Sequence, residues 1–271
     1  MTEAKIAPGP LAGRYHLERV LGTGGMGVVY RARDLLHEQF GEPCSRVALK
    51  VVGEGLAQSS DAHVLLFSEF AVTRSLHHER IVRAFTFEVD TPREVAFFTM
   101  ELLPGLTLDR LLLECPGGVR WPQLQALAVQ VLDALVYAHG QGVLHGDLKP
   151  GNVMVDEAGI RLFDFGLGQG EGLPQLSRDR FSAWTPAYAA PEMADGGALT
   201  PAADLYGVAC MLYELAEGGR PAERQPLKPR RLPRQCWPAL KTALAVDPER
   251  RAISVAELRE ALARTPWRWC L

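Results

Sequence analysis

The chain has 271 residues, of which 47% are hydrophobic and 23% charged, and its formal net charge is −3 at pH 7. These values are typical of an ordinary folded domain and speak against nucleic acid or an anionic membrane surface as a partner. The five cysteines are scattered, odd in number and never spaced as CxxC, which argues against a disulfide framework or a zinc site and favours a reducing cytoplasm.

The length and the apolar pattern limit the architecture. No stretch reaches the roughly eighteen consecutive apolar residues that span a bilayer, and MTEAKIAPGP at the N-terminus lacks the apolar core of a signal peptide. We therefore expect no membrane span in this chain. A chain of this length is also large for a single core, so we expect two lobes with a ligand cleft between them.

The first part of the chain predicts strands. Residues 1–13 carry prolines and glycines and are expected to form a flexible arm. From Tyr15 to about Met100, short β-branched or aromatic runs are broken by Gly, Pro and Asp, with one helical stretch around 62–76. We expect residues 14–101 to form a small, strand-rich lobe.

A glycine-rich motif lies early in this lobe. The sequence LGTGGMGVVY at 21–30 has glycines at the first, third and sixth places of GxGxxG. Residues without side chains let backbone N–H groups approach phosphate oxygens closely. A simple hairpin turn has the same glycines, whereas a dinucleotide-binding turn would need a helix after it, and here a strand follows.

The motif VALK ends an apolar strand on Lys50. By itself this pattern also fits a solvated edge lysine. However, Glu69 lies on the helical face of Leu66 and Val72, where an unpaired buried carboxylate would be costly. Lys50 is the expected partner of Glu69.

The second part of the chain predicts helices. Pro104 and Gly105 interrupt both the strand pattern before them and the helical pattern after them, so a hinge is expected at 102–106. Beyond it, apolar residues recur at helical spacing, which indicates a larger helical lobe over 107–264 with a tail at 265–271. These residues are Leu124, Leu127, Ala128, Val131, Leu132, Leu135, then Leu205, Val208, Ala209, Leu212, Leu215, and then Ala256, Leu258, Ala261 and Leu262.

The most specific motif is HGDLKPGN at 145–152, which precedes the strand VMV. It combines a proton acceptor in Asp147, a cation for a transferring phosphoryl group in Lys149 and a neutral oxygen ligand for Mg²⁺ in Asn152. Further on, LFDFG places Asp164 between aromatic residues at the end of a strand. Alone, such an acid could cap a turn, but with Asn152 upstream a metal site is favoured.

In this order and spacing the motifs resemble the eukaryotic-like, Hanks-type protein kinase catalytic domain. LGTGGMGVVYRARD and HGDLKPGNVM look most like its bacterial Ser/Thr branch. The resemblance runs from about Tyr15 to Ala263. It implies an α+β, bilobal kinase-like fold with a small β-rich N-lobe that holds one main helix and a larger helical C-lobe.

The resemblance also implies cofactors and partners. ATP and Mg²⁺, with Mn²⁺ as an alternative, would serve transfer of the γ-phosphate to Ser or Thr hydroxyls of protein substrates, including autophosphorylation. A counteracting phosphatase is implied as a partner. Thr185 in TPAYAAPE would bond the catalytic Asp and Lys, as the matching Thr does in the Ser/Thr branch, and together with Lys149 it favours Ser or Thr over Tyr as the acceptor.

The site residues follow position by position. The catalytic set would be Asp147, Lys149, Lys50, Glu69 and Thr185, and Mg²⁺ would be held by Asn152 and Asp164. The nucleotide set would be Leu21, Gly22, Thr23, Gly24, Gly25, Met26, Gly27, Val28, Val29, Ala48, Lys50, Met100, Glu101 and Leu103. Two further residues would be structural: Glu192 would pair with Arg251, and Asp204 would brace the catalytic loop through backbone N–H groups.

Three segments depart from the family pattern. Gly146 stands where regulated kinases have the Arg that pairs with a phosphorylated activation loop, so we expect weak dependence on that phosphorylation. Residues 218–237 form a short, basic, Pro-rich loop, read either as a trimmed surface loop or as a site for an acidic partner. The segment 34–45 is longer than the usual turn, and the sequence assigns it no function.

Two other functions compete with this reading. Aminoglycoside kinases share the lobe architecture and a similar HGDxxxxN loop, but they usually lack a lysine at the position of Lys149. A pseudokinase would bind without turnover, but such proteins usually lose the strand lysine or a metal ligand, and here Lys50, Asn152 and Asp164 are all present.

Overall fold

The computed structural model describes residues 9–24, 27–52, 62–165, 185–221 and 226–264. These residues divide into two compact units. The first contains the described residues up to His77 together with Val82–Leu103, and the second contains His78–Ile81 and the described residues from Pro104 onward. Each unit is described by itself.

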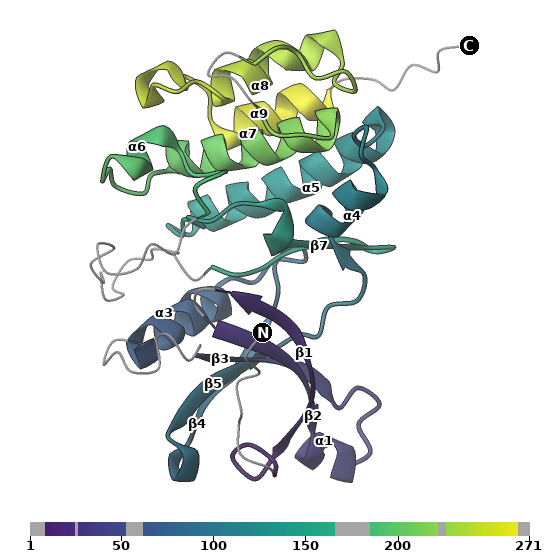
Figure 1. Cartoon of the computed structure of the whole chain (residues 1–271), viewed down its shortest axis with the longest axis vertical. Helices are drawn as coiled ribbons and strands as arrows, with labels where there is room; N and C mark the ends of the chain where they lie inside the picture. Colours follow the sequence, from purple (N-terminus) through teal and green to yellow (C-terminus); the bar gives the residue numbers. More distant parts are fainter. Residues whose placement is uncertain (1–8, 25–26, 53–61, 166–184, 222–225, 265–271) are drawn as a thin grey trace. The chain divides into compact units, whose positions relative to one another are not determined.

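The first unit is an antiparallel sheet with a helix against it. The strands are β1 (Tyr15–Gly24), β2 (Gly27–Asp34), β3 (Arg46–Val52), β4 (Ala84–Asp90) and β5 (Val95–Met100), in the order β1-β2-β3-β5-β4. Strand β3 is buried over most of its length, which is why RVALKVV has no alternation of apolar and polar residues. Helix α3 (Ala62–Ser75) packs on β3, β4 and β5 through Phe70, which contacts Phe87 and Phe98 (Figure 1).

The core on the other side of this sheet includes a residue that precedes it. Leu11, fully buried, joins Tyr15, Leu49 and Phe97 in one cluster. The backbone N–H of Ala12 also donates to Asp90 at 2.7 Å. Residues 9–13 fall in the expected flexible arm, and the packing of Leu11 was not anticipated because a single leucine between Pro10 and Ala12 carries no periodicity.

The second unit is mainly helical. It holds a small sheet of β6 (Leu106–Thr107), β7 (Val153–Asp156) and β8 (Gly159–Leu162). The helices are α4 (Leu108–Glu114), α5 (Trp121–Gly140), α6 (Pro191–Ala194), α7 (Pro201–Glu217), α8 (Trp237–Ala243) and α9 (Val255–Ala263). Helix α5 packs against both α7 and α9, and Figure 1 shows these helices gathered above the small sheet.

The sequence explains where these helices begin and end. Thr200 caps α7 by accepting a hydrogen bond from Ala203, and Gly218 ends it with φ at 87°. A capping box of Ser254 and Glu257 starts α9. The stripes predicted for α5 and α7 are buried, whereas in α9 the buried face is Val255, Leu258 and Leu262 and not Ala256, which is exposed.

These elements confirm the predicted α+β class, with a strand-rich part and a larger helical part. A short 3₁₀ turn (Pro150–Asn152) forms the end of the HGDLKPGN motif and leads directly into β7. The segment 34–45 contains a short helix, α1 (Leu35–Gln39).

Candidate active site

Lys50 and Glu69 form a buried ion pair in the first unit. Lys50 Nζ lies 2.6 Å from Glu69 Oε1 and 2.8 Å from Oε2. The side chains are only 7% and 3% exposed. Strand β3 presents the lysine and α3 presents the glutamate, so the predicted pairing is confirmed. Such a pair fixes an ammonium group on the sheet without leaving either charge unpaired.

The glycine-rich loop joins β1 to β2. A side chain at Gly22 or Gly24 would meet no heavy atom within 4 Å, so their backbone is open to a ligand. Gly27 differs, because a Cβ there would lie 2.2 Å from the carbonyl oxygen of Val51. Gly27 is therefore required by packing on β3. Gly25 and Met26 lie outside the described residues.

The other residues expected around a nucleotide lie on the same sheet or directly after β5. Ala48 and Met100 are buried and directly opposite each other in the β3–β5 register. Leu21 is 41% exposed at the end of β1, and Val28 and Val29 are half-buried on β2. The N–H of Glu101 donates to the carbonyl of Arg83 at 2.9 Å, which leaves the Glu101 carbonyl as its backbone group for adenine. Thr23 is exposed on β1, and Leu103 is half-buried after the end of β5.

The second unit brings three predicted catalytic side chains together. Lys149 Nζ donates to Asp147 Oδ2 and, at 2.8 Å, to the hydroxyl of Thr185. The backbone N–H of Thr185 donates to Asp147 Oδ1 at 2.9 Å. Thr185 thus contacts both partners, but its hydroxyl serves Lys149 and its backbone serves Asp147. This triangle holds a carboxylate and a cation side by side.

Asn152 completes this group from the 3₁₀ turn. Its Nδ2 donates to the carbonyl oxygen of Asp147 at 2.8 Å and approaches Asp147 Oδ2 at 3.3 Å. The side chain is almost fully buried. With the amide nitrogen engaged, the Asn152 oxygen is the atom left for a ligand.

Asp204 braces the catalytic loop from α7, as predicted. It accepts hydrogen bonds of 2.8 Å from the N–H groups of His145 and Gly146. His139, at the end of α5, adds a contact of 2.9 Å to the same carboxylate. His139 was not among the predicted residues, because a histidine near a helix end gives no sequence signal for a partner on a distant helix.

His145 links the loop to the segment before Phe165. Its Nδ1 accepts from the N–H of Asp147 at 3.2 Å, so Nε2 carries the proton and donates to the carbonyl of Phe163 at 3.2 Å. Burial lowers the pKa of His145. The neutral ring is the form that can both accept and donate here, and it positions the backbone of Asp147.

Asp164 occupies an unusual backbone conformation. Its φ is 68°, in the left-handed region, while Phe165 next to it is fully buried against His145. Such conformations cost of order 1 kcal/mol or more and cluster at functional sites. Gly166 lies outside the described residues.

Glu192 and Arg251 form the predicted ion pair. Arg251 Nη1 and Nη2 lie 2.5 and 2.7 Å from the two carboxylate oxygens. The Arg251 side chain is fully buried, and Glu192 is 21% exposed. The pair ties the start of α6 to the segment before α9, a structural role.

The basic segment before α8 uses its cations internally. Arg230 pairs with Glu217 at 2.7 Å, Lys228 donates to the carbonyls of Pro229 and Leu232, and Arg231 contacts the carbonyl of Gly117. These contacts favour the trimmed surface loop over an acidic-partner site. Residues 222–225 are not described.

The donor set fits Mg²⁺ in chemistry. An amide oxygen from Asn152 and a carboxylate from Asp164 are hard oxygen ligands, which Mg²⁺ prefers. Within the described ranges no group of three or more His, Cys, Asp or Glu could hold a metal alone. The remaining ligands would then be phosphate oxygens and water, the usual arrangement for Mg²⁺ with a nucleotide.

Comparison with known proteins decides the family. The sequence profile of the protein kinase domain matches residues 15–252. The chain belongs to the protein kinase family. The kinase domain is 34% identical to the serine/threonine-protein kinase PkaA of Streptomyces coelicolor over 89% of this chain and 48% of that protein. It is 38% identical to the DNA damage-responsive kinase RqkA of Deinococcus radiodurans, over 80% of this chain and 32% of RqkA.

A solved structure agrees with the fold. The kinase domain of PknI from Mycobacterium tuberculosis matches with a TM-score of 0.70 and 26% identity, covering 92% of this chain and 94% of that one. The predicted bacterial Hanks-type resemblance is thus confirmed. The chain spans about half or less of the length of the curated relatives it matches. Among its described helices, none is long and apolar enough to cross a bilayer.

Proposed function

We propose that this kinase domain transfers the γ-phosphate of ATP to Ser and Thr hydroxyls of protein substrates. The observation that carries the proposal is the triangle of Asp147, Lys149 and Thr185, in which a proton acceptor is held beside a cation. The relatives are named serine/threonine-protein kinases, which supports the choice of acceptor.

Each residue of the proposed catalytic set has a separate role in an in-line displacement. A substrate hydroxyl oxygen forms the new bond to the γ-phosphorus, the bond to the β–γ bridging oxygen breaks, and ADP leaves. Asp147 accepts the hydroxyl proton, and Lys149 offsets negative charge on the transferred group. Lys50, oriented by Glu69, holds the α- and β-phosphates. Mg²⁺, held by Asn152 and Asp164, would neutralise phosphate charge when bound.

The nucleotide would lie along the sheet residues of the first unit. The backbone at Gly22 and Gly24 is open for phosphate oxygens, and Ala48 with Met100 offers an apolar surface to adenine. Leu21, Val28 and Val29 extend that surface, and the backbone of Glu101 and Leu103 supplies hydrogen bonds. Thr23, Gly25, Met26 and Gly27 complete the loop in this proposal.

The acceptor class is tested by labelled phosphate transfer. The purified chain receives γ-labelled ATP with casein, with kanamycin, or with neither. We expect label on Ser and Thr of casein, and some on the chain itself, at the family's turnover of about 1–100 per second under optimal conditions. Label on kanamycin alone would assign the chain to the small-molecule phosphotransferases.

Gly146 supports weak dependence on activation-loop phosphorylation. Its φ is 83°, where an arginine would cost about 1–2 kcal/mol, and it supplies no cation for a phosphate. Phosphatase treatment is therefore expected to lower activity less than about tenfold. A larger drop that persists with Thr185 unmodified would contradict this. Ser177 and Ser182 are the proposed autophosphorylation sites, and they belong to residues 166–184, which lie outside the described chain.

The proposal also covers the cellular location of the protein and the partners it would work with. The five cysteines are scattered and never spaced as CxxC, which supports a reducing cytoplasm. A protein kinase of this kind would work with protein substrates and a counteracting phosphatase.

A further inference from the structure

The segment between β2 and β3, to which the sequence assigned no function, builds one side of a pocket. Asp34 caps α1 by accepting from the N–H groups of Leu36 and His37. Arg14 grips the same carboxylate through two hydrogen bonds of 2.9 and 2.6 Å. Burial alone would raise the pKa of Asp34, but the bonds from Arg14 and from the His37 backbone outweigh it and lower that pKa. The segment is therefore anchored as a fixed wall.

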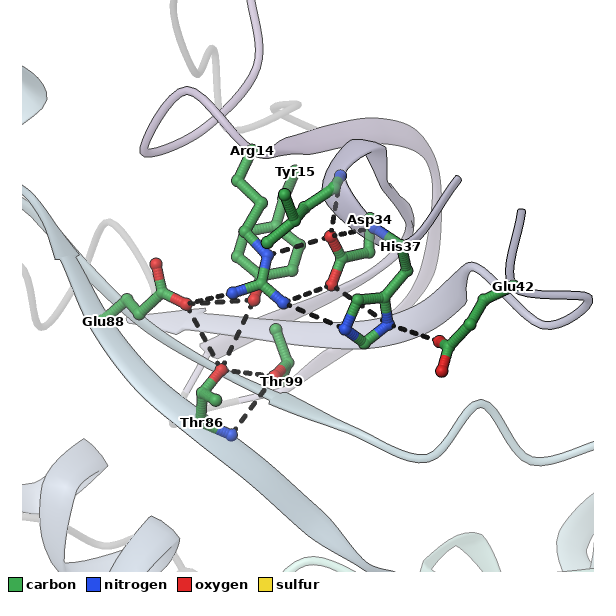
Figure 2. A network of polar contacts seen from close by, with 9 residues as sticks. Arg14, Tyr15, Asp34, His37, Glu42, Thr86, Glu88 and Thr99 are labelled. Atoms are coloured by element: carbon green, nitrogen blue, oxygen red, sulfur yellow. Dashed lines mark hydrogen bonds and ion pairs between the residues drawn. The ribbon is translucent and has the colours of Figure 1, made fainter. Parts of the chain in front are cut away.

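The pocket lies wholly within the first unit and has a volume of about 710 Å³. Its floor carries Thr86 and the buried Thr99, whose hydroxyls are 2.9 Å apart, and Tyr15, which donates to Glu88 at 3.0 Å (Figure 2). Pockets of 300–1,000 Å³ with a few fixed polar groups are typical of small-molecule sites. The pocket therefore has the size of a small-molecule site.

The charges around this pocket are unequal. Arg14 is committed to Asp34 and, at 3.6 Å, to Glu88. Arg46 is 58% exposed and lies 3.7 Å from Glu18, whose carboxylate Arg31 approaches to 2.5 Å. Arg14 is therefore offset by Asp34, whereas Arg46 stays as one exposed cation on the lining.

Two carboxylates remain on the wall and rim. The carboxylate of Glu42, from the segment after α1, lies 2.8 Å from the ring of His37, and the side chain is 58% exposed (Figure 2). Glu101, at the end of β5, has no ion pair with any residue of the described chain. Neither carboxylate thus has a lysine or arginine partner within the described ranges. Two such carboxylates against the one exposed Arg46 leave the lining with an excess of negative charge, which favours a cationic ligand.

Apolar surface lies among these charges. Phe85 is 40% exposed and lines the pocket together with Val47 and Leu102. A ligand that matches this lining has cationic groups joined by an apolar chain, since the carboxylates attract ammonium groups and the apolar walls bury methylenes.

We propose that this pocket binds a small aliphatic polyamine, with ammonium groups at Glu42 and Glu101 and a methylene chain against Phe85. The site is separate from the residues of phosphate transfer, except that Glu101 also belongs to the expected adenine hinge. The inference does not rest on the proposed function, because binding is measured directly.

Isothermal titration with spermidine tests the site on the whole chain. Wild type is expected to bind, and Glu42→Gln or Glu101→Gln to weaken binding about fivefold each, the effect of one solvated ion pair. The matched control is Glu38→Gln, because Glu38 lies on the same segment but pairs with Arg33 and does not line the pocket. In Glu38→Gln the loss of spermidine affinity should stay under about twofold.

Further ligands and variants test the roles of charge and of apolar contact, and distinguish a small molecule from a protein segment. Octane-1,8-diol, which lacks charge, should not bind. Phe85→Ala should weaken spermidine binding, whereas Val89→Ala should not, because Val89 lies on the same strand but outside the pocket. A lysine tetrapeptide that binds more tightly than spermidine would assign the pocket to a protein segment and overturn the small-molecule assignment. Absence of spermidine binding, or equal losses in Glu42→Gln and Glu38→Gln, would also overturn it.

Discussion

At the scale of single residues, Lys50 and Glu69 show how burial fixes chemistry. The carboxylate is nearly inaccessible on α3 and the ammonium group nearly inaccessible on β3, so each buried charge is stabilised by the other. This pairing could be predicted from sequence because the apolar face of the helix already placed Glu69 inside.

Glu69→Ala should lower the free energy of unfolding by about 3–5 kcal/mol, because Lys50 is left charged and buried. The double variant Lys50→Met/Glu69→Leu should lose much less, since it removes both charges. Urea denaturation measures both, with Glu79→Ala as control because that side chain is 75% exposed. A double variant less stable than Glu69→Ala would show that the pair is not the source of the cost.

His145 makes a prediction about pH. Burial lowers its pKa in the folded chain, so the folded state resists a proton that the unfolded state accepts below about pH 6.5. The contribution to stability is therefore full above that pH and is lost as the pH falls below it. NMR titration of the ring should give a pKa under about 6.5. A value above it would refute the neutral ring and its hydrogen bond from Asp147.

At the scale of elements, the strands and helices are determined by local sequence patterns, whereas the contacts that hold them in place join residues far apart in the sequence. Helical periodicity predicted the buried faces of α5 and α7, whereas the caps at Thr200 and Ser254 came from the structure. The contact of Asp204 with His139 and that of Arg14 with Asp34 could not be predicted, because each joins residues far apart with no pattern in common. The pocket beside α1 was missed for the same reason.

Leu11 tests the anchoring of the segment before β1. Leu11→Ala should lower the free energy of unfolding by about 2–5 kcal/mol, because it removes a fully buried side chain from the core shared with Tyr15 and Phe97. Leu36→Ala is the control, since Leu36 is 44% exposed on α1, and it should change stability by less than about 0.5 kcal/mol. Equal effects of the two variants would contradict the packing of Leu11.

At the scale of the whole molecule, most of the functional prediction came from the order of the motifs along the chain. Spacing within HGDLKPGN placed Asp147, Lys149 and Asn152 in one loop, and the structure joins them to Thr185 across a long stretch of sequence. Which backbone or side-chain atom of Thr185 serves which partner depends on three-dimensional geometry and could not be predicted. The family assignment confirms the reading from motifs.

The central claim is that Asp147 acts in phosphate transfer by a working kinase. The decisive measurement is the rate of γ-phosphate transfer to casein by wild type, Asp147→Asn and Asp133→Asn, with ATP affinity measured on the same preparations. Asp133 is a control because it pairs with Arg259 on the helix surface of the second unit.

We predict that Asp147→Asn lowers the rate by about 10²–10⁴-fold while ATP still binds, and that Asp133→Asn stays within about threefold of wild type. Retention of more than about a tenth of the activity by Asp147→Asn would contradict the role of Asp147. Tight ATP binding without transfer in wild type would instead make the chain a nucleotide-binding module.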